Sequence, residues 1–251
     1  MDNFDSKNRF TSRAEDYAKY RCEYPKEIVG YLKETISFTG DHVVADVGSG
    51  TGILTKYFIE SGNQVYAIEP NKEMRERAEK SFSACKNFYS VNGSSENTKL
   101  SKEKIDIIIS AQAFHWFDPI LTKLEFAKIL KPKGYVIILW NNIKNVSDGF
   151  MSEYKQIKDN YKKNLMLEPI EDKISEFFKP NEVIKKTFEN KVFFNFERLI
   201  GEIISHSYMP NQSHPKFDLM KEDLYYLFDK YNENGKVDFE YTTYVRCCRF
   251  K

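Results

Sequence analysis

Paired cysteines and long apolar runs are both scarce in this sequence. The four cysteines form no C-x-x-C pair and have no histidine partners at zinc-ligand spacing: they are Cys22, Cys85, Cys247 and Cys248. This pattern argues against a disulfide framework and against a metal site. No apolar stretch approaches the ~20 residues that cross a bilayer, and no charged segment followed by an apolar one opens the chain. We therefore expect a cytoplasmic protein with no metal and no membrane partner.

An excess of charge of one sign is also lacking. The 251 residues include 38 basic and 37 acidic side chains, which gives a formal net charge of +1. A chain so balanced has no strong field to attract nucleic acid or an anionic membrane surface. We therefore expect no nucleic-acid partner. The length suits one large domain with an insertion, and the sequence leaves open whether the protein is a monomer or a homodimer.

Between residues 43 and 140, short apolar runs alternate with amphipathic segments. This alternation predicts parallel strands joined by right-handed helical crossovers. The expected strands cover residues 42–47, 64–69, 87–91, 104–111 and 135–140. We expect a first helix directly after the first strand, where Leu54, Tyr57 and Phe58 recur at helical spacing. A second helix should cover residues 71–82, with Asn71 as its N-cap. A third should cover residues 119–130 and end at a turn formed by residues 131–134.

Beyond residue 140 the pattern is less regular. Helical spacing over residues 145 to about 190 is interrupted at Pro169 and Pro180, and residues 190–196 are typical of a returning strand. Two more helices are expected at 197–208 and 218–233. A terminal strand at 236–247 follows the turn Asn234-Gly235, and we expect it to form an antiparallel hairpin at the sheet edge.

The stretch "VVADVGSGTG", residues 43–52, ends the first strand with three closely spaced glycines. Gly48, Gly50 and Gly52 let the backbone approach a ligand, and the next helix offers unpaired N–H groups. The dinucleotide pattern G-x-G-x-x-G is not met, because the third glycine falls one residue early. Asp46, two residues before the first glycine, would repel a pyrophosphate but would favour an ammonium group. The alternative is a tight strand-to-helix turn without a ligand.

A second acidic residue lies in register with this turn. Glu69 follows Gly48 by 21 residues and ends the second strand, where an acid can accept the two hydroxyls of a ribose. Taken alone, a glutamate at a strand end is an ordinary solvated loop residue. Together, the turn and Glu69 predict a ligand in which a nucleoside is joined to an amino acid without phosphates.

Three segments carry a resemblance to a known family. "VADVGSGTG", "AIEPNKEM" and "IDIIISAQAFHWFD" resemble the signatures of class I S-adenosylmethionine-dependent methyltransferases of type 11, over residues 43–140. "RAEDYAKYRCEYP", "AQAFHWFD" and "SHSYMP" are similar to the small-molecule branch that includes trans-aconitate methyltransferase-like proteins. Where many relatives read Arg-Pro, this chain has Arg21-Cys22, so its backbone is less restrained there.

The resemblance implies a fold. We expect an α/β domain with a Rossmann-like, doubly wound, seven-stranded sheet, mostly parallel with an antiparallel C-terminal edge strand, plus a helical insertion. Within this single domain, residues 1–40 would form an N-terminal helical segment over the cofactor and 41–142 the cofactor-binding core. Residues 145–220 would form a helical insertion on the substrate side, and 221–251 the C-terminal helix and edge strand.

The resemblance also implies a binding site for S-adenosyl-L-methionine. Asp46 would lie near the ammonium group, Glu69 would bind the ribose, and Arg21 would bind the methionine carboxylate or an anionic substrate. The residues implied to bind the cofactor are Arg21, Asp46, Gly48, Ser49, Gly50, Glu69, Pro70, Asn71, Met74, Ser95, Glu96, Ala111 and Gln112. The plainer alternatives are a surface salt bridge for Arg21 and a helix cap for Ser95.

Methyl transfer from a sulfonium depends mainly on alignment and the exclusion of water. A carboxylate acceptor would need an Arg or Lys to hold it, whereas a hydroxyl, amine or acidic carbon would need a base, worth ~10²- to 10⁴-fold in rate. The candidates for a catalytic or substrate-contacting role are His115, Tyr17 and Tyr208, with His206 beside the last. His115 could instead only pack beside the next helix, capped by Asp118, and Tyr208 could be an ordinary helix-end residue.

The sequence therefore favours an enzyme that transfers a methyl group from S-adenosylmethionine to a small molecule, at oxygen, nitrogen or carbon and with a carboxylate among the options. One alternative is a protein that binds S-adenosylmethionine without catalysis. Another is an NAD-dependent dehydrogenase, since Tyr154 and Lys158 have Y-x-x-x-K spacing, but the glycine pattern T-G-x-x-x-G-x-G of those enzymes is absent. Methylation of nucleic-acid bases is disfavoured by the balanced charge. It is also disfavoured by the sequence "SAQAF", which stands where an amino-methylating enzyme would have an Asn- or Asp-Pro-Pro-aromatic motif.

Overall fold

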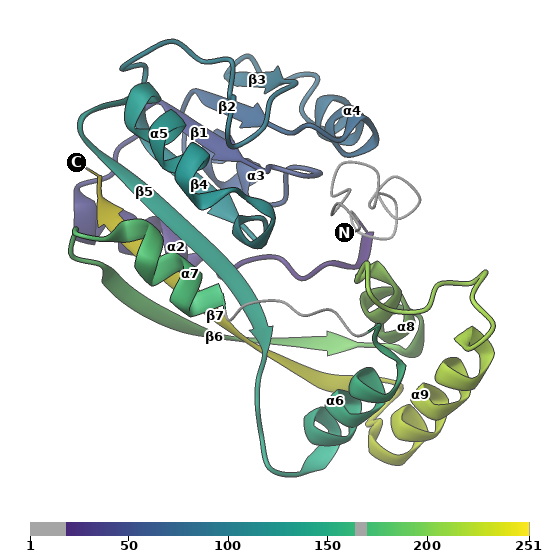
Figure 1. The fold of residues 1–251 in the computed structure, drawn as a ribbon. Coiled ribbons are helices and arrows are strands. Elements are labelled where there is room, and N and C mark those ends of the chain that lie inside the picture. Colours follow the sequence, from purple (N-terminus) through teal and green to yellow (C-terminus); the bar gives the residue numbers. More distant parts are fainter. Residues whose placement is uncertain (1–18, 164–169, 251) are drawn as a thin grey trace.

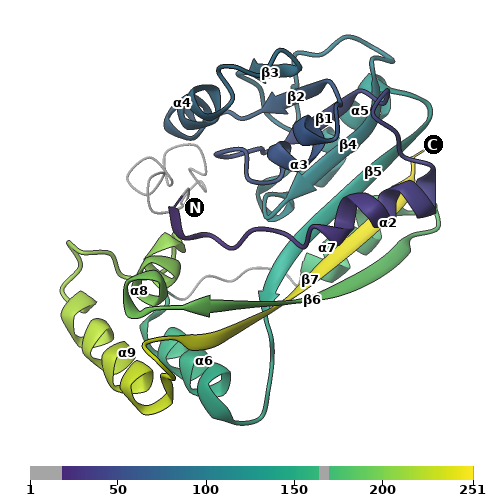
Figure 2. The same ribbon diagram turned by 180° about the vertical axis from the view of Figure 1, so that it is seen from behind.

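The computed structural model describes residues 19–163 and 170–250, and these form a seven-stranded sheet with helices on both faces (Figures 1 and 2). The strand order is β3-β2-β1-β4-β5-β7-β6. The strands are β1 (Val44–Val47), β2 (Val65–Ile68), β3 (Phe88–Val91), β4 (Ile105–Ala111), β5 (Leu130–Ile143), β6 (Ile184–Phe194) and β7 (Val237–Arg249). The helices are α2 (Glu27–Ile36), α3 (Thr55–Glu60), α4 (Lys72–Ser81), η2 (Phe114–Trp116), α5 (Pro119–Ile129), α6 (Gly149–Tyr161), α7 (Ile170–Phe178), α8 (Phe196–Ser205) and α9 (Phe217–Tyr231).

The first five strands pair in parallel, which confirms the expected doubly wound core. Their neighbouring residues alternate between two apolar layers: Ile108 belongs to the layer under α5 and α7, whereas Ile107 and Ile109 belong to the layer under α2 and α3. Because both faces are covered, β1, β2 and β4 are mainly apolar and almost fully buried. Two N-caps are also confirmed: the Asn71 side chain accepts from the Met74 N–H, and the Asp118 side chain accepts from the first turn of α5.

The C-terminal half departs from expectation in the position of its strands. β7 is antiparallel to β5, as expected, but it lies between β5 and β6, so β6 forms the sheet edge. The Asn234-Gly235 turn has two positive φ angles, of 52° and 74°, and joins α9 to β7. The expected simple hairpin is therefore wrong, because α8 and α9 separate the two paired strands along the chain. β5 is also longer than expected, and residues 131–134 form a bulge at its start instead of a turn before it.

A third apolar cluster lies at the carboxyl ends of β5 and β6 and at the amino end of β7. It is built from α6, α8 and α9 with the adjoining ends of β6 and β7, and its fully buried members include Tyr154, Leu199 and Phe239. In both ribbon views these helices stand apart from β1, β2 and β3 (Figures 1 and 2). In the range 145–220 the structure thus contains α6, α7 and α8 together with the strand β6. No helix among the described residues is both long and apolar enough to cross a membrane.

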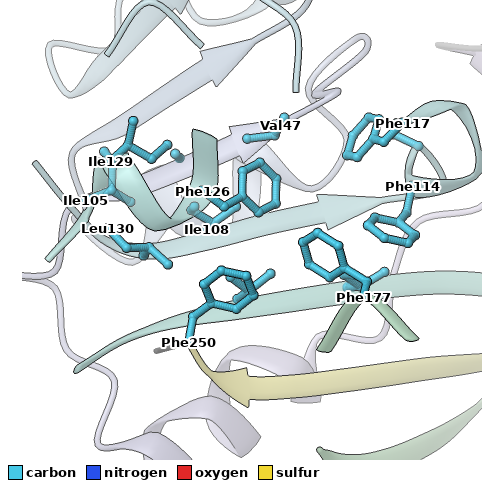
Figure 3. Packing of buried hydrophobic residues seen from close by; sticks show 14 of the residues in the cluster. Val47, Ile105, Ile108, Phe114, Phe117, Phe126, Ile129, Leu130, Phe177 and Phe250 are labelled. Atoms are coloured by element: carbon cyan, nitrogen blue, oxygen red, sulfur yellow. The ribbon is translucent and has the colours of Figure 1, made fainter. Parts of the chain in front are cut away.

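The aromatic core under α5 and α7 fixes the chain segment that follows β4. Phe177 of α7 packs edge-on against Phe114 and Phe126, with ring centroids 4.9 and 6.0 Å apart, and stacks on Phe250 (Figure 3). Phe117 packs against Phe114 in the same cluster. Burying such rings stabilises their positions by several kcal/mol in total, on the order of 2 kcal/mol each. The segment after β4 is therefore anchored at both of its phenylalanines.

Candidate active site

A cavity of about 890 Å³ lies at the carboxyl ends of β1, β4 and β5, between the parallel core and the α6–α8 end of the molecule. Its volume is near the upper end of the ~300–1,000 Å³ typical of small-molecule sites. The carboxyl edge of a doubly wound sheet is where ligands bind in this architecture. Ten of the residues expected in the site line it: Arg21, Asp46, Gly48, Ser49, Gly50, Ala111, Gln112, His115, His206 and Tyr208.

The glycine turn between β1 and α3 has a backbone that side chains would disturb. Gly48, Gly50 and Gly52 have φ angles of +71°, +57° and +86°, in the left-handed region that favours glycine. A Cβ atom on Gly48 would lie 2.5 Å from Ala113, and one on Gly52 would lie 2.4 Å from the Phe82 ring. At Gly50 the corresponding space is open and borders the cavity. Two of the glycines thus serve close packing, and the third leaves room beside the cavity.

Asp46 and Ser49 present polar groups at this turn. The Asp46 carboxylate is almost fully buried and accepts a hydrogen bond of 2.5 Å from the Thr55 hydroxyl. Burial, and to a lesser degree the charge of Glu69, raises the pKa of Asp46 to about 7. The Ser49 hydroxyl oxygen is buried and has no hydrogen-bond partner among the described residues. An unpaired buried hydroxyl costs ~1–3 kcal/mol, so a ligand group at this wall would stabilise the turn.

Glu69 joins the glycine turn to the next helix. One of its carboxylate oxygens accepts from the Gly50 N–H at 2.9 Å, and the other accepts from the Asn71 N–H at 2.8 Å. Burial raises the pKa of Glu69, and these two hydrogen bonds oppose the shift. A carboxylate has about four lone-pair sites, so each oxygen can still accept a further donor.

Six of the expected cofactor residues do not line the cavity: Glu69, Pro70, Asn71, Met74, Ser95 and Glu96. Glu69, Asn71 and Met74 are linked to the glycine turn by the hydrogen bonds described above. The Ser95 hydroxyl donates to Glu96, whose carboxylate accepts from the Asp118 N–H at 3.1 Å. Ser95 and Glu96 therefore stabilise the segment after β4 through the hydrogen bond to the Asp118 N–H.

The segment after β4 turns two of its side chains toward the cavity. Phe114 and Phe117 are buried in the aromatic core, and His115 and Trp116 line the cavity together with part of Phe114. Lys173 of α7 donates to the main-chain oxygens of His115 and Phe117, at 3.3 and 2.8 Å. At the end of β4, Gln112 has a φ of +55°, and its side-chain amide donates to the Asn141 carbonyl at 2.9 Å. Hydrogen bonds between side chains and main-chain oxygens therefore hold this wall both at the end of β4 and in the segment that follows it.

The opposite wall contains a polar cluster that the sequence analysis missed in part. Glu202 of α8 is buried, and its carboxylate accepts hydrogen bonds from Tyr154, from Tyr241 at 3.3 Å and from the His206 ring at 2.8 Å. The Lys158 ammonium lies 3.1 Å from the same ring nitrogen of His206. The i,i+4 spacing of Glu202 and His206 was visible in the sequence. The two tyrosines come from distant segments, so nothing local indicated that they join the cluster.

Burial and the neighbouring charges determine which groups of this cluster are ionised. Burial favours the neutral form of Glu202, but the interaction with His206, through charge and a hydrogen bond, and the positive charges of Lys158 and Arg21 outweigh it and hold the pKa of Glu202 well below its usual range. Burial, together with the charges of Arg21 and Lys158, lowers the pKa of His206 to about 3. Glu202 is therefore ionised, and it accepts from the nearest ring nitrogen of His206.

The chain segment before α2 reaches the cavity by packing on α8. The Tyr20 ring lies directly over Gly201, where an added Cβ would approach it to 2.2 Å. The Tyr20 hydroxyl donates to Glu197 at 2.9 Å, and Lys19 binds the same carboxylate oxygen. Arg21 then lines the cavity. Tyr17, an expected catalytic residue, lies outside the described residues.

Residues 45–138 match the family model for a methyltransferase domain. An uncharacterized methyltransferase of Mycobacterium tuberculosis is 32% identical over 132 residues, which are 53% of this chain and 51% of that protein. An uncharacterized methyltransferase of Geobacillus kaustophilus is 32% identical over 139 residues, which are 51% of this chain and 63% of the relative. The chain thus matches about half to two thirds of the length of these curated relatives.

Solved structures share the fold at low sequence identity. A protein provisionally assigned as a type II methyltransferase, from Anaeromyxobacter dehalogenans, superimposes with a TM-score of 0.66 at 16% identity, covering 92% of this chain and 98% of the other. A SAM-dependent methyltransferase from Aquifex aeolicus gives a TM-score of 0.51 at 16% identity, covering 93% and 97%. Residues 45–138 thus match a methyltransferase domain in sequence, and the described chain shares its fold with these solved structures.

Proposed function

We propose that the protein transfers the methyl group of S-adenosylmethionine to a small-molecule acceptor. The observation that carries this proposal is the buried Asp46 carboxylate beside the Ser49 hydroxyl, which has no partner in the described part of the chain; both lie on the wall of a cavity of about 890 Å³. A carboxylate with a raised pKa gains most from a ligand that brings a positive charge, such as the ammonium of an amino acid. It would repel the pyrophosphate of a dinucleotide.

The residues present fit the cofactor. Asp46 would hold its ammonium group, the backbone around Gly48, Ser49 and Gly50 its methionine part, and Glu69 its ribose. Pro70, Asn71, Met74, Ser95 and Glu96 would border the adenine, and Ala111 and Gln112 the sulfonium. When bound, S-adenosylmethionine supplies an activated methyl group with a good leaving group. The contribution of the protein is then to orient the acceptor and exclude water.

His115, Tyr208 and Arg21 are the residues that we assign to the acceptor side, because all three line the cavity. His115 is carried by the segment that Phe114 and Phe117 anchor in the core, so its main chain is held firmly. His206 lines the cavity as well, but its hydrogen bond to Glu202 gives it a positioning role. Which of O-, N- or C-methylation occurs depends on the acceptor.

The dehydrogenase alternative is disfavoured by the position of Tyr154. Its side chain is fully buried, and its hydroxyl donates to Glu202, so it is not available as a catalytic acid beside Lys158. The alternative of a protein that binds S-adenosylmethionine without catalysis is separated from an enzyme by a labelled-methyl screen over carboxylic acids, phenols and amines. Transfer to any acceptor would establish the enzyme.

Calorimetry tests the cofactor. We expect S-adenosylhomocysteine to bind and NAD not to bind, and we expect Asp46→Asn and Glu69→Gln each to weaken the binding of S-adenosylhomocysteine about tenfold or more, since each removes a charge-assisted contact. Asp106→Asn is the matched control, because Asp106 is also a strand aspartate but binds Val43 N–H and Lys131 at the opposite end of β4. Binding of NAD alone would refute the proposal.

A further inference from the structure

The α6–α8 wall of the cavity holds more positive charge than its buried acid requires. Glu202 is the one buried carboxylate of this wall among the described residues, whereas Arg21 and Lys158 both act on it. Lys155, Lys162 and Lys163 add further positive charge at the rim, and of these Lys162 is paired with Asp159 at 2.7 Å. The wall as a whole therefore attracts anions.

Glu202 is itself not available to a ligand. One carboxylate oxygen accepts from Tyr154, and the other accepts from His206 and Tyr241. The side chain is 1% exposed. A cationic acceptor, such as an amine, would therefore find at this wall only the Asp159 carboxylate, which Lys162 already pairs. The role of Glu202 is to fix the orientation of the groups around it.

Among the residues that the structure describes, the Lys158 ammonium forms no salt bridge, and its one hydrogen-bond contact is with a ring nitrogen of His206. The carboxylate of Glu202 can only accept, so its 2.8 Å approach places a hydrogen on the ring nitrogen of His206 nearest to it. The same nitrogen lies 3.1 Å from the Lys158 ammonium and, as a donor, cannot accept from it. The other contact of Lys158 is with the face of the Tyr208 ring, 5.5 Å from its centroid. The half-buried ammonium thus lies on the cavity wall, and no carboxylate of the described residues forms a salt bridge with it.

We propose that Lys158 binds a carboxylate group of the methyl acceptor. Of the proposed function, this inference uses only that the cavity binds an acceptor. Trp140, Ile143 and Tyr208 line the same cavity, so the acceptor would combine the carboxylate with an apolar or aromatic body. α6 and α8 stand at the opposite end of the molecule from β2 and β3 (Figure 1), whereas the proposed cofactor site adjoins β1 and β2. The carboxylate therefore orients the acceptor, and the atom that receives the methyl group belongs to another part of the acceptor.

Benzoate and its neutral analogue benzamide test the inference. Trp116 and Trp140 line the cavity, so tryptophan fluorescence reports binding in the presence of saturating S-adenosylhomocysteine. We expect benzoate to bind at least tenfold more tightly than benzamide, because a charge-assisted hydrogen bond contributes roughly that much. Lys158→Met should remove this preference, and Lys158→Arg should retain most of it. Equal binding of the two probes, or no binding of benzoate, would overturn the inference.

A matched variant and a second measurement separate this inference from the proposed function. Lys221→Met removes an exposed charge from α9, outside the cavity lining, and should change benzoate binding by less than about twofold. S-adenosylhomocysteine affinity should be unchanged in Lys158→Met. A loss of that affinity would show that Lys158 binds the carboxylate of the cofactor instead, which overturns the inference. If the wild-type protein binds no S-adenosylhomocysteine, the proposed function fails, and benzoate binding can still be measured alone.

Discussion

Asp46 is buried by the fold before any ligand is bound, and this has a consequence for pH dependence. Its pKa is raised from 3.8 to about 7, chiefly by burial, so near pH 6 the free protein carries it in the protonated form. A ligand ammonium prefers the ionised form, so binding below pH 7 must first remove the proton. Affinity for an amino-acid ammonium therefore falls as the pH falls through 7.

We expect the affinity for S-adenosylhomocysteine to drop about tenfold between pH 7.0 and pH 5.5, a range in which an α-amino group, with pKa near ~7.7–8.0, stays charged. Calorimetry at both values measures the drop. The weaker binding of Asp46→Asn should depend much less on pH, since the titrating group is gone. A pH dependence as steep in the variant as in the wild type would show that Asp46 does not contact the ammonium.

The same shift has the opposite sign for folding without ligand. The folded state holds the Asp46 proton more tightly than the unfolded chain does, so the free energy of unfolding decreases as the pH rises from about 4 to about 7. The loss is on the order of a few kcal/mol, at ~1.4 kcal/mol per pKa unit. In urea titrations, Asp46→Asn should therefore gain stability relative to the wild type between pH 5 and pH 8.

The strand-to-helix turn after β1 combines two kinds of glycine. Gly52 is required by packing, because a side chain would meet the Phe82 ring. Gly50 has open space where its side chain would be and borders the cavity. Alanine at either position adopts a left-handed backbone at a cost of ~1 kcal/mol, and a clash with a buried ring adds about 1–3 kcal/mol.

We therefore expect Gly52→Ala to lower the free energy of unfolding by ~2–4 kcal/mol and Gly50→Ala by only about 1 kcal/mol. Ligand binding should respond in the opposite order, with the larger loss of S-adenosylhomocysteine affinity, tenfold or more, in Gly50→Ala. Urea titration and calorimetry of both variants give the two rankings. Should Gly52→Ala lose more affinity than Gly50→Ala, the open space at Gly50 would not belong to the ligand.

Local patterns in the sequence predicted the elements that depend on neighbouring residues. The first four strands, the caps Asn71 and Asp118 and the glycine turn follow from apolar spacing and hydrogen-bonding side chains a few residues apart. The position of β7 between β5 and β6 depends on pairing across more than 40 residues, and no local signal determines that order. For the same reason, the Glu202 cluster could be predicted only as far as His206, on the same helix.

At the scale of the whole molecule, the two sides of the cavity are held together by continuous strands. β7 contributes Phe239 to the cluster of α6, α8 and α9, Val245 to the layer under α2 and α3, and Cys248 to the layer under α5 and α7. β5 likewise runs from the parallel core to Ile143, which packs against the α6–α8–α9 cluster. A strand cannot lose its pairing at one end without strain at the other, so we expect the two ends of the molecule to unfold together.

Leu199→Ala tests this cooperativity. Leu199 is fully buried in the α6–α8–α9 cluster, and its truncation should lower the free energy of unfolding by ~2–5 kcal/mol, whereas Leu219→Ala, at a 60% exposed position on α9, should change it by less than about 0.5 kcal/mol. Trp140 reports by fluorescence on the aromatic core under α5 and α7, and circular dichroism reports on all helices. With continuous strands, both signals of Leu199→Ala should shift to the same lower urea midpoint. A tryptophan midpoint that stays at the wild-type value would show that the cavity lies between two independently folding bodies, and ligand binding would then have to hold them together.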